Sequence, residues 1–188
     1  IILKLTQDLS KKYKIENLCM AGGVALNCVA NGKILKGNIF KNIWIQPAAG
    51  DAGGSLGAAL AYWHRELGNS RNYSDNDNMS GSYLGPKYKN DEIENKLNEL
   101  KGVYRKINDS DLIKETALNL SKQKIVGWFQ GRMEFGPRAL GCRSILADPR
   151  SDKMQRILNL KVKFRESFRP FAPSVLSGDV NKWFELNH

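Results

Sequence analysis

The alternation of apolar and polar positions along the chain predicts an α/β fold. Apolar residues recur at helical spacing over 1–14, and short apolar runs at 17–21 and 42–46 are typical of buried strands. Helical spacing returns at 24–35 and again at 55–67, where alanine is abundant. This order of helix, strand, helix, strand and helix implies an α/β layer with parallel strands.

A second pattern begins near residue 91, after a segment at 68–90 that is rich in Asn, Ser, Asp and Gly and poor in aliphatic residues. We predict a linker or surface excursion there. Beyond it we expect helices at 91–100, 110–123 and 151–160, strands at 103–107, 124–129, 143–147 and 171–176, and a further element starting at 180–184. The helix at 110–123 should turn its apolar face inward, with Leu112, Ile113, Ala117 and Leu120.

Composition narrows the class of protein. The 188 residues are 41% hydrophobic and 26% charged, as in a soluble globular protein, and no apolar run is long enough to cross a membrane. No signal peptide is present, and the chain starts in a helical pattern without Met, so we expect a piece of a longer protein. Three cysteines without a close pair indicate reduced thiols and a cytoplasmic location. Only two histidines are present, neither near a cysteine, which argues against zinc.

Positive charge is concentrated between residues 131 and 170. This stretch carries ten Lys or Arg residues and four acids, which gives +6 of the chain's net +10. Arginine predominates, and its planar fork suits bidentate recognition of phosphate or carboxylate. A solvated basic surface is the ordinary alternative. Glycines at 131, 136 and 141 would let the backbone approach a ligand closely, which favours an anion pocket.

Two glycine turns in the first segment, Gly22-Gly23 and Gly53-Gly54, each follow a predicted strand and precede a predicted helix. We expect 50–54 to be a flexible turn. Free N–H groups at a helix N-terminus bind phosphate readily, although such glycines are often only structural. Asp51 could reach a bound metal or orient a ligand, and its plainer interpretation is an N-cap.

Four segments resemble the O-carbamoyltransferase family, which includes the nodulation-factor and antibiotic carbamoyltransferases. Residues 18–27 read LCMAGGVALN and are similar to a nucleotide-binding GGVAxN turn, and residues 46–59 read QPAAGDAGGSLGAA. Residues 127–146, GWFQGRMEFGPRALGCRSIL, and 159–173, NLKVKFRESFRPFAP, resemble the C-terminal domain of the same family. The last two motifs are long and specific.

The resemblance implies an α/β fold with two parts. Residues 1–67 would be the end of an actin-like (ASKHA) carbamoyl-transfer domain, 68–90 a linker, and 91–188 a truncated YrdC-like domain with a twisted mixed sheet and a positively charged cavity. It places Gly22 and Gly23 against the adenosine end of the nucleotide, with Asn27 nearby. Gly53 and Gly54 are further candidates for nucleotide binding, because their turn precedes a predicted helix. Asp51 matches an aspartate ligand of an iron-type divalent metal. Its two histidine partners have no counterpart here, so that site would be incomplete.

The family joins carbamoyl phosphate and ATP into carbamoyl-adenylate and passes the carbamoyl group to a hydroxyl of a small-molecule acceptor. Crowded phosphates need cations close by, and fixed guanidinium groups can stabilise a departing pyrophosphate. For this role the sequence offers Arg132, Arg138, Arg143, Lys163, Arg165 and Arg169. Glu134 could orient one arginine or hold Mg²⁺, or form a plain ion pair. The isolated chain is not expected to complete carbamoyl transfer.

Two other functions fit part of the pattern. An RNA-binding YrdC-like module would show affinity that falls steeply with salt. Against it, the basic residues are separated by Gly and Pro rather than arranged along one helix face, so we do not expect a nucleic-acid partner. A tRNA threonylcarbamoyl-type transferase is the other alternative, but the long FGPRALG and FRPFAP motifs favour the small-molecule branch. No membrane partner is expected, and the oligomeric state is open.

Overall fold

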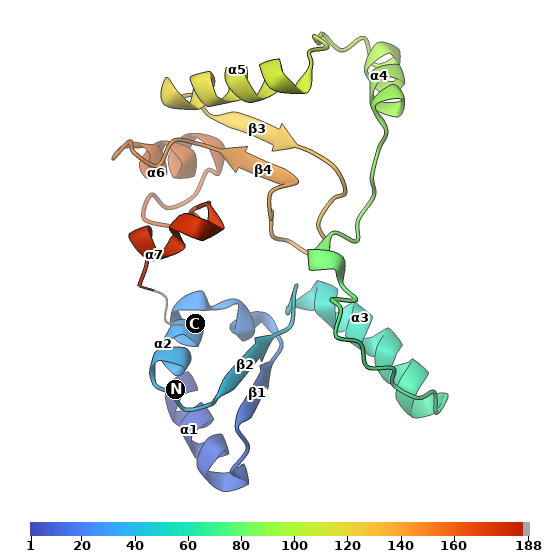
Figure 1. Ribbon diagram of the computed structural model, residues 1–188, viewed down its shortest axis with the longest axis vertical. Helices are drawn as coiled ribbons and strands as arrows, with labels where there is room; N and C mark the ends of the chain where they lie inside the picture. Colours follow the sequence, from blue (N-terminus) through green and yellow to red (C-terminus); the bar gives the residue numbers. More distant parts are fainter. Residues whose placement is uncertain (186–188) are drawn as a thin grey trace. The chain divides into compact units, whose positions relative to one another are not determined.

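The computed structural model describes residues 1–185 and confirms an α/β protein (Figure 1). The chain forms two compact units. Unit 1 contains residues 1–96 together with 129–143, and unit 2 contains residues 97–128 together with the chain from 144 onward. The basic stretch at 131–170 is therefore divided between the two units, which are described separately below.

Unit 1 is built on two parallel strands. The strands β1 (Asn17–Met20) and β2 (Asn42–Ile45) pair from Asn17 opposite Asn42 to Met20 opposite Ile45, as the pattern predicts. The helices α1 (Ile2–Tyr13) and α2 (Cys28–Lys36) belong to the same unit and contact each other. The apolar core of this unit consists of Ala25, Ile34, Phe40 and Ala49.

Two predicted boundaries in unit 1 are wrong. The helix expected at 24–35 is broken, because a 3-10 turn (Gly23–Leu26) ends before Asn27, whose side-chain Oδ1 accepts the N–H of Ala30 at 3.1 Å and caps α2. The turn expected at 50–54 is mostly helical. Helix α3 (Asp51–Ala61) begins there and continues into a π-helical turn (Tyr62–Glu66).

The polar segment after this helix is largely irregular. Between residues 68 and 89 it forms one short 3-10 turn (Ser80–Ser82) and an isolated antiparallel bridge between Lys87 and Arg132. Helix α4 (Asn90–Glu99) follows where a helix is predicted. The bridge fastens this segment to the arginine-rich loop.

Unit 2 contains helix α5 (Asp109–Ser121) and a two-stranded sheet of β3 (Val126–Phe129) and β4 (Arg143–Leu146), whose strands run in opposite directions in Figure 1. Helix α6 (Met154–Ile157) passes into a π-helical turn (Leu158–Val162), and a 3-10 turn (Ser177–Asp179) leads into α7 (Val180–Trp183). The buried residues next to α6 are Met154, Leu158 and Asn159.

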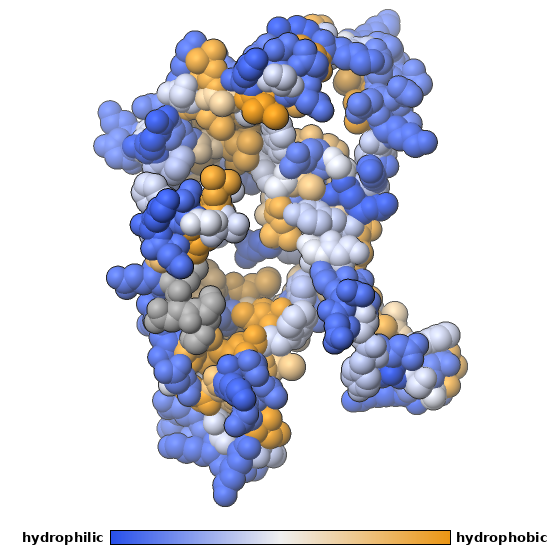
Figure 2. All heavy atoms as spheres, in the orientation of Figure 1, coloured by the Kyte–Doolittle hydropathy of each residue, from blue (hydrophilic) through white to orange (hydrophobic). Residues whose placement is uncertain are grey.

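Three predictions for unit 2 are wrong. Residues 103–107 and 171–176 form no strand, because within residues 1–185 no neighbouring strand pairs with them. In the first of these segments the guanidinium of Arg105 instead pairs with Glu115 on α5. The α5 residues Leu112 and Ile113 are not inward but 38% and 64% exposed. Ala117 is exposed as well, and Leu120 is half-buried. Figure 2 shows apolar residues at the molecular surface among the polar ones.

Two general expectations can be compared with the structure. No helix within residues 1–185 is both long and apolar enough to span a bilayer. All three cysteines are free thiols, and Cys19 and Cys28 are exposed.

Candidate functional site

The arginine-rich loop in unit 1, residues 130–143, is closed by one buried carboxylate. Glu134 is 4% exposed, and its Oε1 accepts the backbone N–H groups of Leu140 and Cys142, each at 2.7 Å, and that of Arg143 at 3.3 Å. Its Oε2 accepts the Arg143 Nε–H at 2.9 Å. Four donors therefore converge on a single side chain, which fixes the path of the loop around it.

The pKa of Glu134 reflects this environment. Burial has the largest single influence and by itself raises the pKa, because it disfavours the charged form. The hydrogen bonds from Arg143 and from the N–H groups of Leu140 and Cys142 together outweigh burial and lower the pKa to about 2. Glu134 is thus ionised at neutral pH, and its oxygens are engaged by protein donors. This arrangement supports orientation of an arginine rather than coordination of Mg²⁺.

The three arginines of the loop differ in how they are held. The Nη2 of Arg143 donates to the carbonyls of Glu134 and Gly136 at 3.1 and 3.2 Å, so this guanidinium braces the loop from within. The Nη1 of Arg132 donates to the carbonyl of Gly85 at 2.7 Å. Arg138 is exposed and makes no hydrogen bond or ion pair within residues 1–185. Of the three, Arg138 is the guanidinium left open to a ligand.

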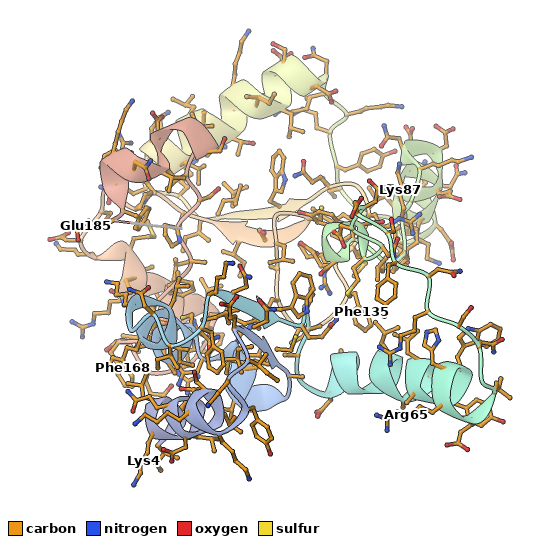
Figure 3. All side chains as sticks on the ribbon, turned by 60° about the horizontal axis from the view of Figure 1, so that its bottom comes forward. Lys4, Arg65, Lys87, Phe135, Phe168 and Glu185 are labelled. Atoms are coloured by element: carbon orange, nitrogen blue, oxygen red, sulfur yellow. The ribbon has the colours of Figure 1, made fainter. Side chains whose placement is uncertain are left out.

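The loop is anchored to the rest of unit 1 at several points. Phe135, labelled in Figure 3, donates its N–H to the carbonyl of Ser82 at 2.7 Å, and the hydroxyl of Tyr83 donates to the carbonyl of Leu140 at 2.8 Å. Gly136 has φ +93°, and a Cβ at this position would lie 2.5 Å from the Cβ of Ala48. Only glycine allows this approach, so the loop is held against the segment that follows β2.

The predicted glycine turns reach the same segment. The N–H of Gly22 donates to the carbonyl of Ala49 at 2.7 Å, and a Cβ on Gly53 would clash with the carbonyl of Ala48. Gly23 and Gly54 have no neighbour that a Cβ would meet within 4 Å. The structure therefore gathers the glycine turns and the arginine loop at the carboxyl end of the parallel strands, where α/β folds commonly bind ligands.

Two further predicted site residues, Asn27 and Asp51, lie at the starts of helices α2 and α3. The side-chain oxygen of Asn27 caps α2, as described above. Asp51 is exposed in the first turn of α3, where Gly50 rather than Asp51 is the N-cap residue. Residues 1–185 bring no three His, Cys, Asp or Glu side chains close enough to share a metal ion. Asp51 would need ligands from outside this part of the chain, so no chemical step is assigned to a metal here.

The second group of predicted cations belongs to unit 2. Lys163 is exposed, the guanidinium of Arg165 donates from Nε to Asn159 Oδ1 at 2.8 Å, and Arg169 donates to both carboxylate oxygens of Glu166 at 2.8 and 3.2 Å. Arg169 holds the pKa of Glu166 below its usual range. Sequence reasoning did not single out Asn159. The residues three and four positions before it, Arg156 and Gln155, are polar and exposed, so apolar spacing gives no signal that Asn159 is buried.

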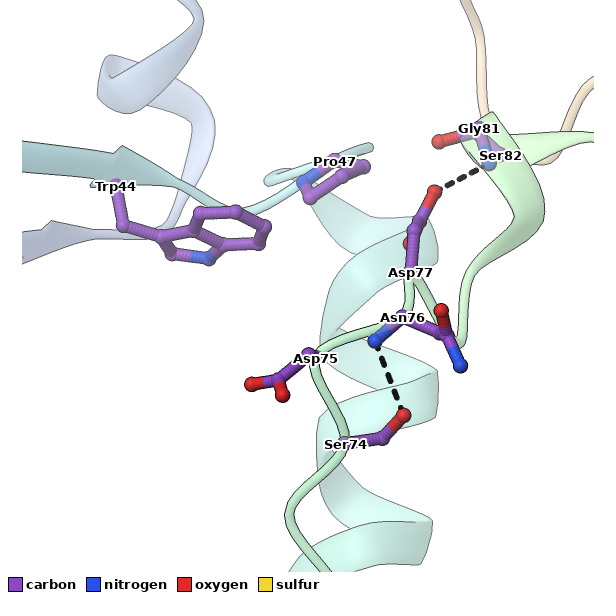
Figure 4. A pocket seen from close by; sticks show the side chains of 8 residues that line it. All are labelled: Trp44, Pro47, Ser74, Asp75, Asn76, Asp77, Gly81 and Ser82. Carbon is purple, nitrogen blue, oxygen red and sulfur yellow. Dashed lines mark hydrogen bonds between the residues drawn. The ribbon is translucent and has the colours of Figure 1, made fainter.

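The structure also contains a hollow in unit 1 that the sequence did not predict. Its volume is about 570 Å³, and Figure 4 shows Trp44 and Pro47 on one side and the segment with Asp75 and Asp77 on the other. Ser74, Asn76, Gly81 and Ser82 complete the lining. No cation lines it, so this hollow does not match the expected anion pocket. The cations of unit 1 and those of unit 2 are described within their own units, so a cavity that both groups share stays a prediction.

The fold and loop describe an α/β protein with a preformed arginine loop beside two parallel strands, and comparison with known proteins gives the family. The family model for the carbamoyltransferase N-terminus matches residues 1–60, and that for the carbamoyltransferase C-terminus matches residues 117–188. Together they match most of the chain. The chain belongs to the carbamoyltransferase family.

Similar proteins are found among bacteria. The chain is 57% identical to the uncharacterized protein sll1178 of Synechocystis, which matches over the whole chain and 31% of its own length. It is 47% identical to the nodulation protein NolO of Bradyrhizobium diazoefficiens and 44% identical to the nodulation protein NolNO of Sinorhizobium fredii, each over 99% of the chain and over 33% and 27% of the relative. The chain thus spans about a third of the length of these relatives.

Proposed function

We propose that this chain is part of a carbamoyltransferase that forms carbamoyl-adenylate and transfers its carbamoyl group to a hydroxyl of a small molecule. In the first reaction water cleaves carbamoyl phosphate into carbamate and phosphate. An oxygen of the carbamate then attacks the α-phosphorus of ATP, and the bond to the β-phosphate breaks. Carbamoyl phosphate, ATP and one water give carbamoyl-adenylate, pyrophosphate and phosphate. In the second reaction the acceptor oxygen takes the carbamoyl group and AMP leaves.

The observation that carries this proposal is the arginine loop. Buried Glu134 holds the loop in shape, and Arg138 remains exposed and unpaired within residues 1–185. A fixed guanidinium can stabilise the charge that develops on departing pyrophosphate without reorganising during the reaction. Magnesium would enter bound to ATP, since Glu134 is already occupied by protein donors.

The finer domain assignment is part of the same proposal. Residues 1–67 would contribute the nucleotide-binding end of an ASKHA-type domain, with Gly22 and Gly23 at the adenosine end of the nucleotide and the Gly53-Gly54 turn as a further contact. The cations of unit 2, Lys163, Arg165 and Arg169, would belong to a YrdC-like domain. The match of separate N-terminal and C-terminal family models to the two ends of the chain supports such a division.

The test uses the full-length protein, because the chain spans about a third of its relatives. We expect pyrophosphate release from ATP only when carbamoyl phosphate is present, and carbamoyl-adenylate in the product mixture by mass spectrometry. Arg138→Ala should lower the rate by about 10²-fold, the usual scale for removing a group that stabilises developing charge. Arg156→Ala, which removes an exposed arginine on α6, is the matched control and should leave the rate near wild type.

Two outcomes would contradict the proposal. Pyrophosphate release that does not depend on carbamoyl phosphate would remove the carbamoyl donor from the reaction. Equal rates for Arg138→Ala and Arg156→Ala would remove Arg138 from the site. Tight RNA binding whose affinity falls steeply with salt, without turnover of ATP, would favour the RNA-binding alternative.

A further inference from the structure

A second buried polar residue organises the basic loop of unit 2, residues 163–169. Asn159 is fully buried at 0% exposure, in the π-helical turn that follows α6. A buried polar side chain is costly unless its hydrogen bonds are satisfied, so the partners of this residue show what it holds in place.

Both ends of the Asn159 amide are used. Its Nδ2 donates to the carbonyls of Ser167 at 3.0 Å and Arg169 at 2.8 Å, and its Oδ1 accepts the Nε–H of Arg165 at 2.8 Å. Reversing the amide would set its NH₂ group against a guanidinium donor and its oxygen against two carbonyls. The partners therefore dictate the orientation, and only an amide supplies an acceptor and two donors together.

The backbone and a neighbouring ring add to this restraint. Phe164 has φ +49°, and the N–H of Arg165 donates to the Asn159 carbonyl at 3.0 Å, which reverses the chain directly after the helical turn. The guanidinium carbon of Arg165 lies 5.0 Å from the centre of the Phe171 ring. The guanidinium is thus fixed from two sides, and neither contact uses its two terminal amino groups.

We propose that Asn159 is a positioning residue for anion binding in unit 2. It sets the plane of the Arg165 guanidinium and the path of residues 167–169, so that the terminal amino groups of Arg165 are ready for a bidentate oxyanion such as a phosphate group. This inference rests on the proposed function, because it assumes that Arg165 binds a phosphate-bearing ligand. Asn159 itself is too deeply buried to contact that ligand.

Gln155 provides a matched control. It lies one helical turn before Asn159, and its Nε2 donates to the carbonyls of Phe168 at 3.2 Å and Arg169 at 3.1 Å. It shares the Arg169 carbonyl with Asn159, but Arg165 donates its Nε–H to Asn159. If Asn159 only fastens the loop backbone, its removal should weaken anion binding no more than removal of Gln155 does. If it acts through Arg165, its removal should weaken anion binding more.

The experiment measures the affinity of the full-length protein for inorganic pyrophosphate by calorimetry, with Asn159→Ala, Arg165→Ala, the double variant and Gln155→Ala. Loss of a charge-assisted hydrogen bond should make Arg165→Ala bind about tenfold more weakly, and Gln155→Ala should stay within about threefold of wild type. Asn159→Ala should approach the Arg165→Ala value, and the double variant should bind no more weakly than Arg165→Ala alone.

The positioning role would be overturned if the two substitutions lowered the affinity for pyrophosphate additively in the double variant. It would also be overturned if Asn159→Ala lowered this affinity no more than Gln155→Ala does. Either result would leave the proposed function intact. Unchanged affinity in Arg165→Ala would instead overturn the placement of Arg165 in the anion site. If Asn159→Ala does not fold, hydrogen exchange of the arginine Nε–H groups in the wild type replaces it. Slower exchange at Arg165 than at exposed Arg156 supports the role, and equal exchange contradicts it.

Discussion

The Oε2 atom of Glu134 accepts the Nε–H of Arg143 at 2.9 Å, while the Nη2 of Arg143 returns to the carbonyl of Glu134 at 3.1 Å. The two residues thus bond to each other through side chain and backbone at once. The carboxylate is fully buried, and the arginine side chain is 31% exposed. This pair closes the loop that presents Arg138, and it makes the loop sensitive to both substitution and pH.

Removing the carboxylate should destabilise unit 1 strongly. Glu134→Ala leaves the Arg143 guanidinium and three backbone N–H groups without their acceptor, and breaking a buried ion pair from one side costs about 3–5 kcal/mol. Glu166→Ala is the control, because the pair of Glu166 with Arg169 is half exposed and such pairs contribute little to stability. Urea unfolding of the two variants measures both effects, and equal losses would contradict the role given to Glu134.

The same carboxylate should make stability depend on pH. The folded-state pKa of Glu134, about 2, is below its value in an unfolded chain, so the unfolded chain binds the proton more readily. Its contribution is complete above the unfolded pKa, near about 4.3, and is lost as the pH falls through the folded pKa. Unfolding free energies from pH 6 down to pH 2 should fall more steeply in the wild type than in Glu134→Gln. Parallel curves would show that Glu134 is not the responsible group.

The contact between Gly136 and Ala48 predicts a rescue experiment. Gly136→Ala should destabilise the loop, because the added methyl meets Ala48 and the residue has φ +93°. Ala48 itself has φ +52°, where glycine is less strained, so Ala48→Gly should be tolerated and should restore part of the loss in the double variant. Gly57→Ala on α3 is the control, since a Cβ there meets nothing within 4 Å. Thermal unfolding checks each variant, and no rescue would argue against this contact.

The ion pair between Arg169 and Glu166 predicts a gain of binding. Its partners are about half exposed, and the hydrogen bond from Arg169 lowers the pKa of Glu166. Glu166 is therefore a carboxylate at neutral pH, as an ordinary glutamate is. If Arg169 takes part in an anion site, Glu166→Gln removes a competing carboxylate. Repulsion between a carboxylate and a nearby polyanion is screened by water and salt, so the affinity for pyrophosphate should rise by about two- to fivefold at low salt. A fall in affinity would mean that Glu166 instead orients Arg169.

Local patterns in the sequence predict those helices and strands whose formation is governed by the spacing of their own apolar residues. The strands β1 and β2, the helices α1, α4 and α5, and their order follow from apolar spacing. The strands expected at 103–107 and 171–176 failed because a strand also needs a partner, which local spacing does not reveal. Helix α3 begins at Asp51, before the predicted start at residue 55. The glycines at 53 and 54 suggest a turn in the sequence, although both fit the first turn of the helix.

The candidate site was predictable in residue type but not in role. The density of arginine and glycine drew attention to residues 131–143, and the motif resemblance indicated the family. Neither revealed that Arg143 braces its own loop while Arg138 is left open, because that distinction depends on the folded positions of Glu134 and Gly136. Asn159 was missed for the same reason, since its partners are eight and ten residues away along the chain.

The hydrogen bonds that the Glu134 carboxylate accepts within the arginine loop span no more than nine residues, from Glu134 to Arg143. These bonds shape the loop from within, and the bonds to Ser82, Tyr83 and Gly85 hold it against the preceding segment. A ligand that meets Arg138 finds a backbone already ordered, so little conformational entropy remains to be lost on binding.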